Sequence, residues 1–240
     1  MSDFLDTMAA SSAARARNAV PPEPKLRPRP PLATGRFGII AEIKNRSPAE
    51  GALAGKGADR VARAKTYAAA GAAAISVLTE PDRFDGHLDH LAEVVDAVPG
   101  TPVMRKDFLV DPVQVREAHA VGASGVLLIT TMVDDPTLRT MLDCAFEHDL
   151  FVLLESFDDV DLASAVRLNR KRFGGGLALS FAHAFSETVG LQLASGLEGA
   201  KSSFSWVYLG NIQAASLLFH AGLSPSLDFN PDVPLALTAE

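Results

Sequence analysis

The sequence predicts an α/β protein whose core is a closed (β/α)8 barrel. Short apolar runs alternate with amphipathic helical segments, and the ends of these runs follow one another about every 23 to 35 residues, the length of one βα unit. The runs are apolar on both faces, as in a parallel sheet covered by helices. No GxGxxG motif follows the first run, which disfavours a doubly wound, dinucleotide-binding sheet.

The alternation begins at Phe37 and is regular up to about residue 170. The expected strands are GIIAEIK (38–44), AAAISVLT (72–79), PVMRKDF (102–108), GVLLITT (125–131) and FVLLE (151–155). The expected helices lie at 58–71, 88–98, 111–122, 134–149 and 158–168.

The two ends of the chain differ from this repeat. Residues 1–36 are predicted to hold a short amphipathic helix at about 3–18 and then a proline-rich, extended connector. Residues 37–240 form the predicted barrel domain, whose last part, 173–240, has few charges and no clear period. We interpret its segments as strand six (175–181), strand seven (202–210), a helix (212–222) and strand eight (224–229), which gives a complete barrel or one with an irregular, degenerate C-terminal part.

Composition excludes several classes of partner. The formal net charge is −7 and no aromatic-plus-basic cluster is present, so we expect no nucleic-acid partner, whereas a small anionic substrate is compatible with a locally positive site. No apolar run reaches the roughly 18 residues of a membrane span, and the N-terminus lacks the apolar core of a signal peptide. We therefore expect a cytoplasmic protein without membrane contacts, as a monomer or weak homo-oligomer.

Metal and disulfide chemistry are not expected either. Cys144 is the single cysteine, which excludes an intrachain disulfide framework and a cysteine-based zinc site. The nearest pair of histidines, His87 and His90, has no cysteine or carboxylate at metal-ligand spacing.

Ionisable residues stand at the ends of three of the predicted strands. Glu42 and Lys44 end the first strand, Lys106 and Asp107 the third, and Glu155 the fifth. In a (β/α)8 barrel the carboxyl ends of the strands carry the functional groups, and alternate strands fill the same interior layer. For any one of these charges, a surface position or a structural ion pair is the competing interpretation. Three such strands together favour a shared site.

Two lysines and two glutamates in one site permit acid–base catalysis. Neighbouring cations and partial desolvation lower the proton affinity of a lysine, and the same cations keep a glutamate ionised. A lysine can then donate a proton to a carbonyl or hydroxyl while a glutamate accepts one. Schiff-base chemistry with Lys44 or Lys106 as nucleophile is the alternative.

Longer motifs surround these charges: EIKNRSP, AGAAAISVLTEPDRFDG, MRKDFLVDPVQVREAHAVGASGVLLI and the strand ending in LLE. Together, over about residues 38–165, they closely resemble the indole-3-glycerol-phosphate synthase family, lyases with a TIM-barrel fold that act in tryptophan biosynthesis. The resemblance implies that 1-(2-carboxyphenylamino)-1-deoxyribulose 5-phosphate is cyclised, decarboxylated and dehydrated without cofactor or metal.

The resemblance also implies roles for individual residues. Lys106 would be the general acid at the ketone, and Glu155 the general base of the dehydration. Lys44 would contact the substrate carboxylate and assist loss of the hydroxyl, and Glu42 would orient the lysines.

Substrate-binding positions follow from the same resemblance. Ser47 and Pro48 would belong to the first βα loop, with Ser47 near the phosphate. Phe108 and Leu128 would line the pocket of the aromatic ring, with plain core packing as the alternative for both.

The C-terminal part departs from the family pattern. Family members carry GINNR on strand six, SESGI on strand seven and a glycine–serine phosphate grip after strand eight, whereas the corresponding stretches here are GGGLALS, YLGNI and DFNPD. Gly210 and Asn211 would offer backbone N–H groups to the phosphate, unless Gly210 is only a turn residue. Three functions are therefore compatible with the sequence: an active synthase, a catalytically impaired paralogue that acts as a binding protein, or a different (β/α)8 enzyme that uses Lys106 as a Schiff-base nucleophile on another sugar phosphate.

Overall fold

The computed structural model describes residues 2–33, 38–47, 51–52 and 59–156 and four later strands, at 177–186, 189–196, 203–209 and 215–221. Six neighbouring strands of its main sheet run parallel. In spatial order they are β1 (Gly38–Ile43), β4 (Ala74–Leu78), β5 (Val103–Lys106), β6 (Gly125–Ile129), β7 (Phe151–Ser156) and β8 (Leu177–Ser186).

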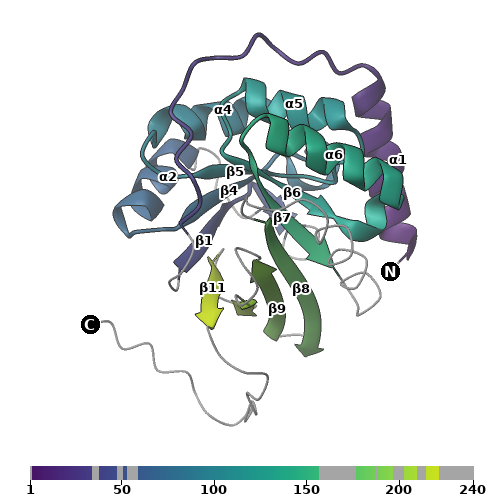
Figure 1. The fold of residues 1–240 in the computed structure, drawn as a ribbon. Coiled ribbons are helices and arrows are strands. Elements are labelled where there is room, and N and C mark those ends of the chain that lie inside the picture. Colours follow the sequence, from purple (N-terminus) through teal and green to yellow (C-terminus); the bar gives the residue numbers. More distant parts are fainter. Residues whose placement is uncertain are drawn as a thin grey trace.

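Helices connect the first five of these strands and cover their outer side (Figure 1). They are α2 (Arg60–Ala69), α3 (Pro81–Phe84), α4 (Leu88–Ala97), α5 (Pro112–Ala120), the 3-10 turn η1 (Thr130–Met132) and α6 (Asp135–Glu147). Helix α5 shows why they start where they do. Asp111 accepts a hydrogen bond from the N–H of Val113, Gln114 completes a capping box, and Pro112 occupies the first helical position. Gly122, with φ of +91°, follows the end of this helix.

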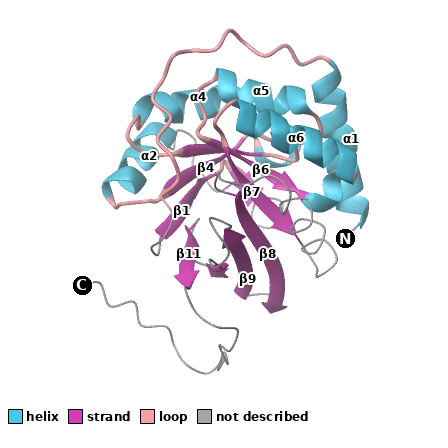
Figure 2. Cartoon of the chain, viewed as in Figure 1, coloured by secondary structure: helices cyan, strands magenta, loops and turns pink. Residues whose placement is uncertain are grey.

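The barrel is closed by antiparallel strands (Figure 2). Strand β8 is followed by β9 (Val189–Gly196), β10 (Ser203–Leu209) and β11 (Ala215–Ala221), each antiparallel to the one before. Strand β11 then pairs antiparallel with β1, where Gly38 lies opposite Leu218. A small two-stranded sheet, β2 (Arg46–Ser47) with β3 (Gly51–Ala52), stands in the connection after β1.

The side chains of the parallel strands form two cores, one on each face of the sheet. The outer core joins alternate strand residues to the helices, for example Val77 and Val126 with Leu91 of α4 and Met141 of α6. The inner core contains the other set: Ile40, Ala74, Met104, Leu127, Ile129 and Leu153, with Phe151 packed against them. Gly125 leaves room for the ring of Phe151, because a Cβ there would lie 2.5 Å from ring carbons.

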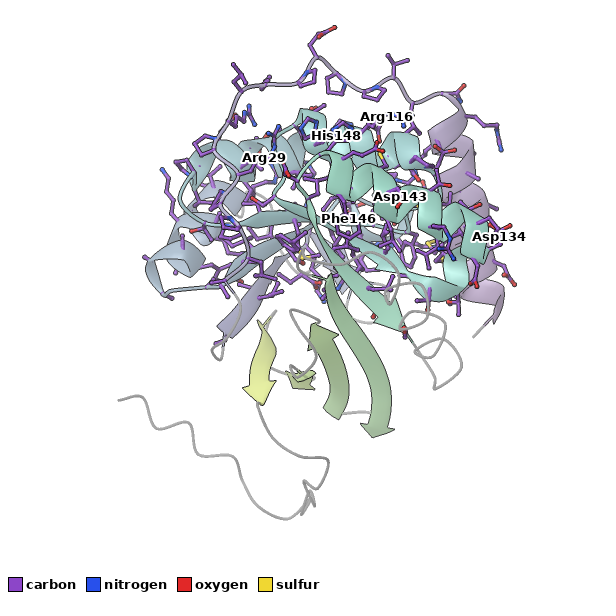
Figure 3. The ribbon with its side chains drawn as sticks, viewed as in Figure 1. Arg29, Arg116, Asp134, Asp143, Phe146 and His148 are labelled. Carbon is purple, nitrogen blue, oxygen red and sulfur yellow. The ribbon has the colours of Figure 1, made fainter. Side chains whose placement is uncertain are left out.

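The N-terminal segment crosses the barrel from one end to the other. Helix α1 (Ser2–Arg17) lies beside the carboxyl ends of the strands, where Met8 joins the inner core. The connector, residues 18–33, then runs over the helical layer (Figure 1). It is fixed near the end of α5: Arg29 donates to the carbonyl of His119 (3.1 Å), whose ring stacks on that of His148 at 4.4 Å. Arg29 and His148 lie on the same side of the molecule in Figure 3.

The structure confirms the α/β barrel class and the five strands that the sequence predicts between residues 38 and 156. It also confirms α1, α2, α4, α5 and α6. The strands predicted at 175–181 and 202–210 overlap β8 and β10, but β10 is antiparallel to both of its neighbours, unlike a strand of a (β/α)8 barrel. The helix predicted at 158–168 and strand eight at 224–229 lie outside the described residues.

One predicted element is wrong and several were not predicted. Residues 215–221 form strand β11 instead of the helix expected at 212–222. The sequence ASLLFHA has no polar helical face, and its apolar run instead suits a strand with neighbours on both sides. Strand β9, the short α3 and the β2–β3 pair were not predicted. None of the helices in the described part of the chain is both long and apolar enough to cross a membrane.

Candidate functional site

Three charged side chains meet on the inner face of the barrel, and we call them the inner ion cluster: Glu42, Lys44 and Lys106. Glu42 follows Ile40 at a spacing of two on β1, and Lys106 follows Met104 in the same way on β5. Since Ile40 and Met104 belong to the inner core, the alternation of a strand directs Glu42 and Lys106 to the same interior. Lys44 stands directly past the end of β1, again two residues on.

Glu42 is the centre of this cluster. Its Oε2 accepts a hydrogen bond from Nζ of Lys106, and its Oε1 lies 3.5 Å from Nζ of Lys44. The Glu42 side chain is 11% exposed and that of Lys44 13%, whereas Lys106 is 38% exposed. Burial alone would raise the pKa of the Glu42 carboxyl, but the two ammonium groups outweigh it and lower the pKa below its ordinary value. The carboxylate is therefore held in its charged form.

Glu155 also belongs to the inner face. It follows Leu153 of the inner core at a spacing of two and lies opposite Ile129 of β6, another inner-core residue. Its backbone carbonyl accepts a hydrogen bond from the hydroxyl of Thr130 (3.1 Å). β5 and β7 flank β6, so their backbones are about 10 Å apart at a strand spacing of about 4.8 Å. A small molecule that lies across β6 is long enough to extend from Lys106 of β5 to Glu155 of β7.

An aromatic group borders the inner ion cluster. Phe108, two residues beyond Lys106, packs against the inner core. Its ring lies 5.8 Å from that of Phe4 on α1, in an edge-to-face arrangement, and 6.2 Å from that of Phe84 at the end of α3. The position of Phe108 is compatible with the ring pocket that the sequence predicts.

The outer side of β5 carries a second set of charges, the outer ion cluster: Arg15, Arg105, Asp107 and Glu117. Arg105 binds Asp107 (3.2 Å) and Glu117 (2.9 Å), and Arg15 of α1 forms two hydrogen bonds with Asp107. The Asp107 side chain is fully buried. Burial alone would raise the pKa of Asp107, but Arg105 and Arg15 outweigh it and lower the pKa. Among the strand-end charges, Asp107 thus fits the structural interpretation.

The remaining predicted site residues are distributed as follows. Leu128 is 1% exposed and packs in the outer core, facing the helices, which favours the packing alternative for this residue. Its neighbours Leu127 and Ile129 face the interior instead. Ser47 ends β2, and its side chain lies outside the described residues, as do Pro48, Gly210 and Asn211.

Several contacts at the strand ends were not anticipated. Thr79, at the end of β4, donates to Asp107 (2.7 Å) and accepts from Arg105 (3.0 Å). Asn45 donates to the carbonyl of Asp85 (2.9 Å) and so ties the segment after β1 to the turn after α3. The motifs EIKN and EPDRFDG contain Asn45 and Asp85, but their pairing depends on the packing of neighbouring strands, which no local pattern reveals.

The described side chains include no group of three or more histidines, cysteines or carboxylates close enough to hold a metal ion. The chemistry that the inner face offers is proton transfer beside a local positive charge, because two ammonium groups surround one carboxylate. Such a site can bind an anion and exchange protons with it.

Comparison with known proteins assigns a family to this arrangement. The family model described as indole-3-glycerol phosphate synthase matches residues 10–175. A curated protein of that name from a Nocardioides species is 43% identical over 173 residues, 72% of this chain and 66% of that protein. The protein of that name from Rhizorhabdus wittichii is 42% identical over 143 residues, which are 60% of this chain and 53% of that protein. The one from Salinibacter ruber is 46% identical over 126 residues, which are 52% of this chain and 46% of that protein. The chain therefore spans about half to two thirds of the length of these relatives.

Proposed function

Since the chain belongs to the indole-3-glycerol phosphate synthase family, we propose that it converts 1-(2-carboxyphenylamino)-1-deoxyribulose 5-phosphate into indole-3-glycerol phosphate, carbon dioxide and water. The observation that carries the proposal is the inner ion cluster. Glu42 is ionised between two ammonium groups at the strand ends, on the face that Glu155 shares. The reaction needs this combination, because its substrate is an anion and both of its halves move protons.

In the first half, the aryl carbon that bears the carboxylate attacks the ketone carbon. Lys106 donates a proton to the ketone oxygen as this bond forms, which turns the oxygen into a hydroxyl. The carboxylate then leaves as carbon dioxide, and its bonding electrons restore the aromatic ring. Lys44 binds the substrate carboxylate before this step, and Glu42 holds both ammonium groups in place.

In the second half, the hydroxyl leaves as water and the indole double bond forms. Lys44 assists by donating a proton to the departing oxygen, and Glu155 accepts a proton from the ring that becomes indole. Phe108 lies against the aromatic ring of the substrate. The Schiff-base alternative has less support, because Lys106 donates a hydrogen bond to a carboxylate as an ammonium does, whereas a nucleophilic amine must be unprotonated.

We assign the substrate phosphate to Ser47 with Pro48 in the first βα loop and to the backbone N–H groups of Gly210 and Asn211. The family model matches residues 10–175, so Gly210 and Asn211 lie beyond its match. The expected cytoplasmic location and the monomeric or weakly associating state remain predictions.

The test is an assay of the purified chain with the carboxyphenylamino-deoxyribulose phosphate, followed by indole fluorescence and by release of carbon dioxide. We expect product from the wild type, no product from Lys106→Ala, and carbon dioxide without matching indole from Glu155→Gln. The last result would identify Glu155 with the dehydration.

Two other outcomes would assign a different function. Folded wild-type protein that gives no product, but gains thermal stability from a substrate analogue, would be the impaired, binding paralogue. A borohydride-trapped adduct on Lys106 would establish Schiff-base chemistry instead.

A further inference from the structure

The end of β5 presents successive side chains to opposite faces of the barrel. Lys106 and Phe108 face the interior, and Asp107 between them faces outward into the outer ion cluster. Whatever fixes Asp107 therefore also fixes the backbone from which Lys106 and Phe108 project.

Asp107 is held by bonds from four directions. Arg15 donates to both of its oxygens (3.0 and 2.9 Å), Thr79 donates from β4 (2.7 Å), and Arg105 donates from β5 itself (3.2 Å). The N–H of Phe108 donates to Oδ1 (2.8 Å), which closes a turn directly after Lys106. A fully buried carboxylate bonded in this way is a rigid point in the structure.

Helix α1 adds the only partner of Asp107, among these contacts, that comes from outside the neighbouring strands β4 and β5. The rest of α1 is fixed to the same end of the barrel: Ser12 accepts from Gln114 (2.9 Å), Ser11 donates to Asp82 (2.8 Å), and Phe4 contacts Phe108. Arg15 is thus anchored by its own helix when it binds Asp107, and the bidentate geometry allows little rotation.

We infer that Arg15 and Asp107 are positioning residues, which hold the end of β5 so that the ammonium group of Lys106 meets Glu42. The Lys106 side chain is long and 38% exposed, so its position depends on where its backbone is held. A displacement of about 1 Å at a reacting group costs up to about 100-fold in rate. The catalytic part of this inference rests on the proposed function, whereas the structural part does not.

The variants that test it are Asp107→Asn and Arg15→Lys. The first keeps the shape of the side chain, and the second keeps the charge but loses the bidentate fork. We expect kcat to fall between about 10- and 100-fold in each, with KM changed less than about twofold, because neither residue contacts substrate.

The pKa of Glu42 is a second measurement. It would stay unchanged if Arg15 and Asp107 only stabilised the fold and did not position Lys106. When Lys106 is displaced, the carboxylate loses its nearest cation and the pKa of Glu42 rises. The simple charge effect of Asp107→Asn has the opposite sign, because removal of a negative charge favours ionisation of other carboxyls. A rise in the Glu42 pKa, followed by carbon-13 NMR and assigned with Glu42→Gln, therefore indicates displacement of Lys106.

Arg27→Gln is the matched control. Arg27 also ties the N-terminal segment to the barrel by an ion pair, with Asp96 at 2.7 Å, but on the side of α4. It should change neither kcat nor the Glu42 titration.

Folded Asp107→Asn and Arg15→Lys proteins with wild-type kcat and an unmoved Glu42 titration would overturn the inference. If Asp107→Asn does not fold, Arg15→Lys alone decides. A wild type without turnover would refute the proposed function, and the Glu42 titration would still confirm or refute the positioning pair.

Discussion

The inner and outer ion clusters share consecutive residues at the end of β5, with Lys106 in the inner cluster and Arg105 and Asp107 in the outer one, yet they differ in exposure and in charge balance. Lys106 is 38% exposed and faces the barrel interior, whereas the side chains of Arg105 and Asp107 are 4% and 0% exposed beneath the helices. The inner cluster has two ammonium groups for one carboxylate. The outer cluster has two guanidinium groups for two carboxylates.

The difference shows how a barrel separates stability from chemistry. Full pairing around the buried Arg105 and Asp107 makes the outer cluster a structural joint between α1, β4, β5 and α5, since each charge has a partner and solvent reaches only part of Arg15 and Glu117. Surplus positive charge and partial exposure leave the inner cluster able to receive an anion. A charge at the end of a strand therefore stabilises the fold on the outer face and is available to a bound anion on the inner face.

The largest expected effect is a loss of kcat caused by a substitution in the inner ion cluster. Lys106→Arg keeps a cation opposite Glu42, but a guanidinium does not give up its proton at neutral pH. We expect kcat for indole formation to fall by about 100- to 10,000-fold while the urea-denaturation midpoint stays close to that of the wild type. Activity within a few fold of the wild type would show that charge, and not proton donation, is what Lys106 supplies.

Next in size is a variant of the outer cluster. Arg105→Met leaves Glu117 without this partner and Asp107 with Arg15 as its remaining cation, so buried charge is no longer balanced. The free energy of unfolding, measured by urea denaturation, should fall by about 3 to 5 kcal/mol. A variant as stable as the wild type would mean that the outer cluster contributes little to the fold.

Acid should affect the outer cluster through Asp107. Its pKa is lowered in the folded protein, so the unfolded chain, with an ordinary pKa of about 3.9, takes up this proton first. The stability that Asp107 contributes is complete above the unfolded pKa and is lost as the pH falls through the folded pKa. Urea denaturation at a series of pH values below about 5 should therefore give a shallower decline for Asp107→Asn than for the wild type. Equal slopes would place the acid sensitivity elsewhere.

The smallest effect sets a baseline for both clusters. Asp111 caps α5 four residues beyond Asp107 and belongs to neither cluster. Asp111→Ala should lower the free energy of unfolding by about 1 kcal/mol, the usual value of an N-cap, and leave kcat unchanged. A loss of kcat in Asp111→Ala would mean that any structural change after β5 alters the site. The losses of kcat could then not be assigned to one ion cluster or the other.

The sequence predicted the parallel part of the fold because its period is strong. Each of β1, β4, β5, β6 and β7 is a short apolar run, and α2, α4, α5 and α6 between them begin at capping residues, so local pattern and tertiary structure agree. The strands after residue 177 lack that agreement. Residues 215–221 are apolar except for Ser216 and His220, and periodicity alone does not tell a buried helix from a buried strand in so short a run.

The site divides in the same way. The period of two on β5 places Met104, Lys106 and Phe108 on one face and Arg105 and Asp107 on the other, so the outward direction of Asp107 was readable from the sequence. The same reasoning separates Leu128 from Leu127 and Ile129. The contact of Arg15 with Asp107 could not be predicted from the sequence, because the two residues are 92 positions apart and meet only when a separate helix docks on the barrel.

That distance along the chain has a consequence for biosynthesis. Helix α1 leaves the ribosome before β5, because Asp107 and Phe108 emerge more than 90 residues later, about 5 to 20 seconds at ordinary rates of translation. A 16-residue helix without tertiary contacts is marginal in water, so α1 is not stably folded until β5, the third strand of the main sheet in chain order, provides its contacts with Arg15 and Phe4. During that interval Phe4 and Met8 are without their partners in the folded protein, and a nascent-chain chaperone that binds short apolar segments would find a target there.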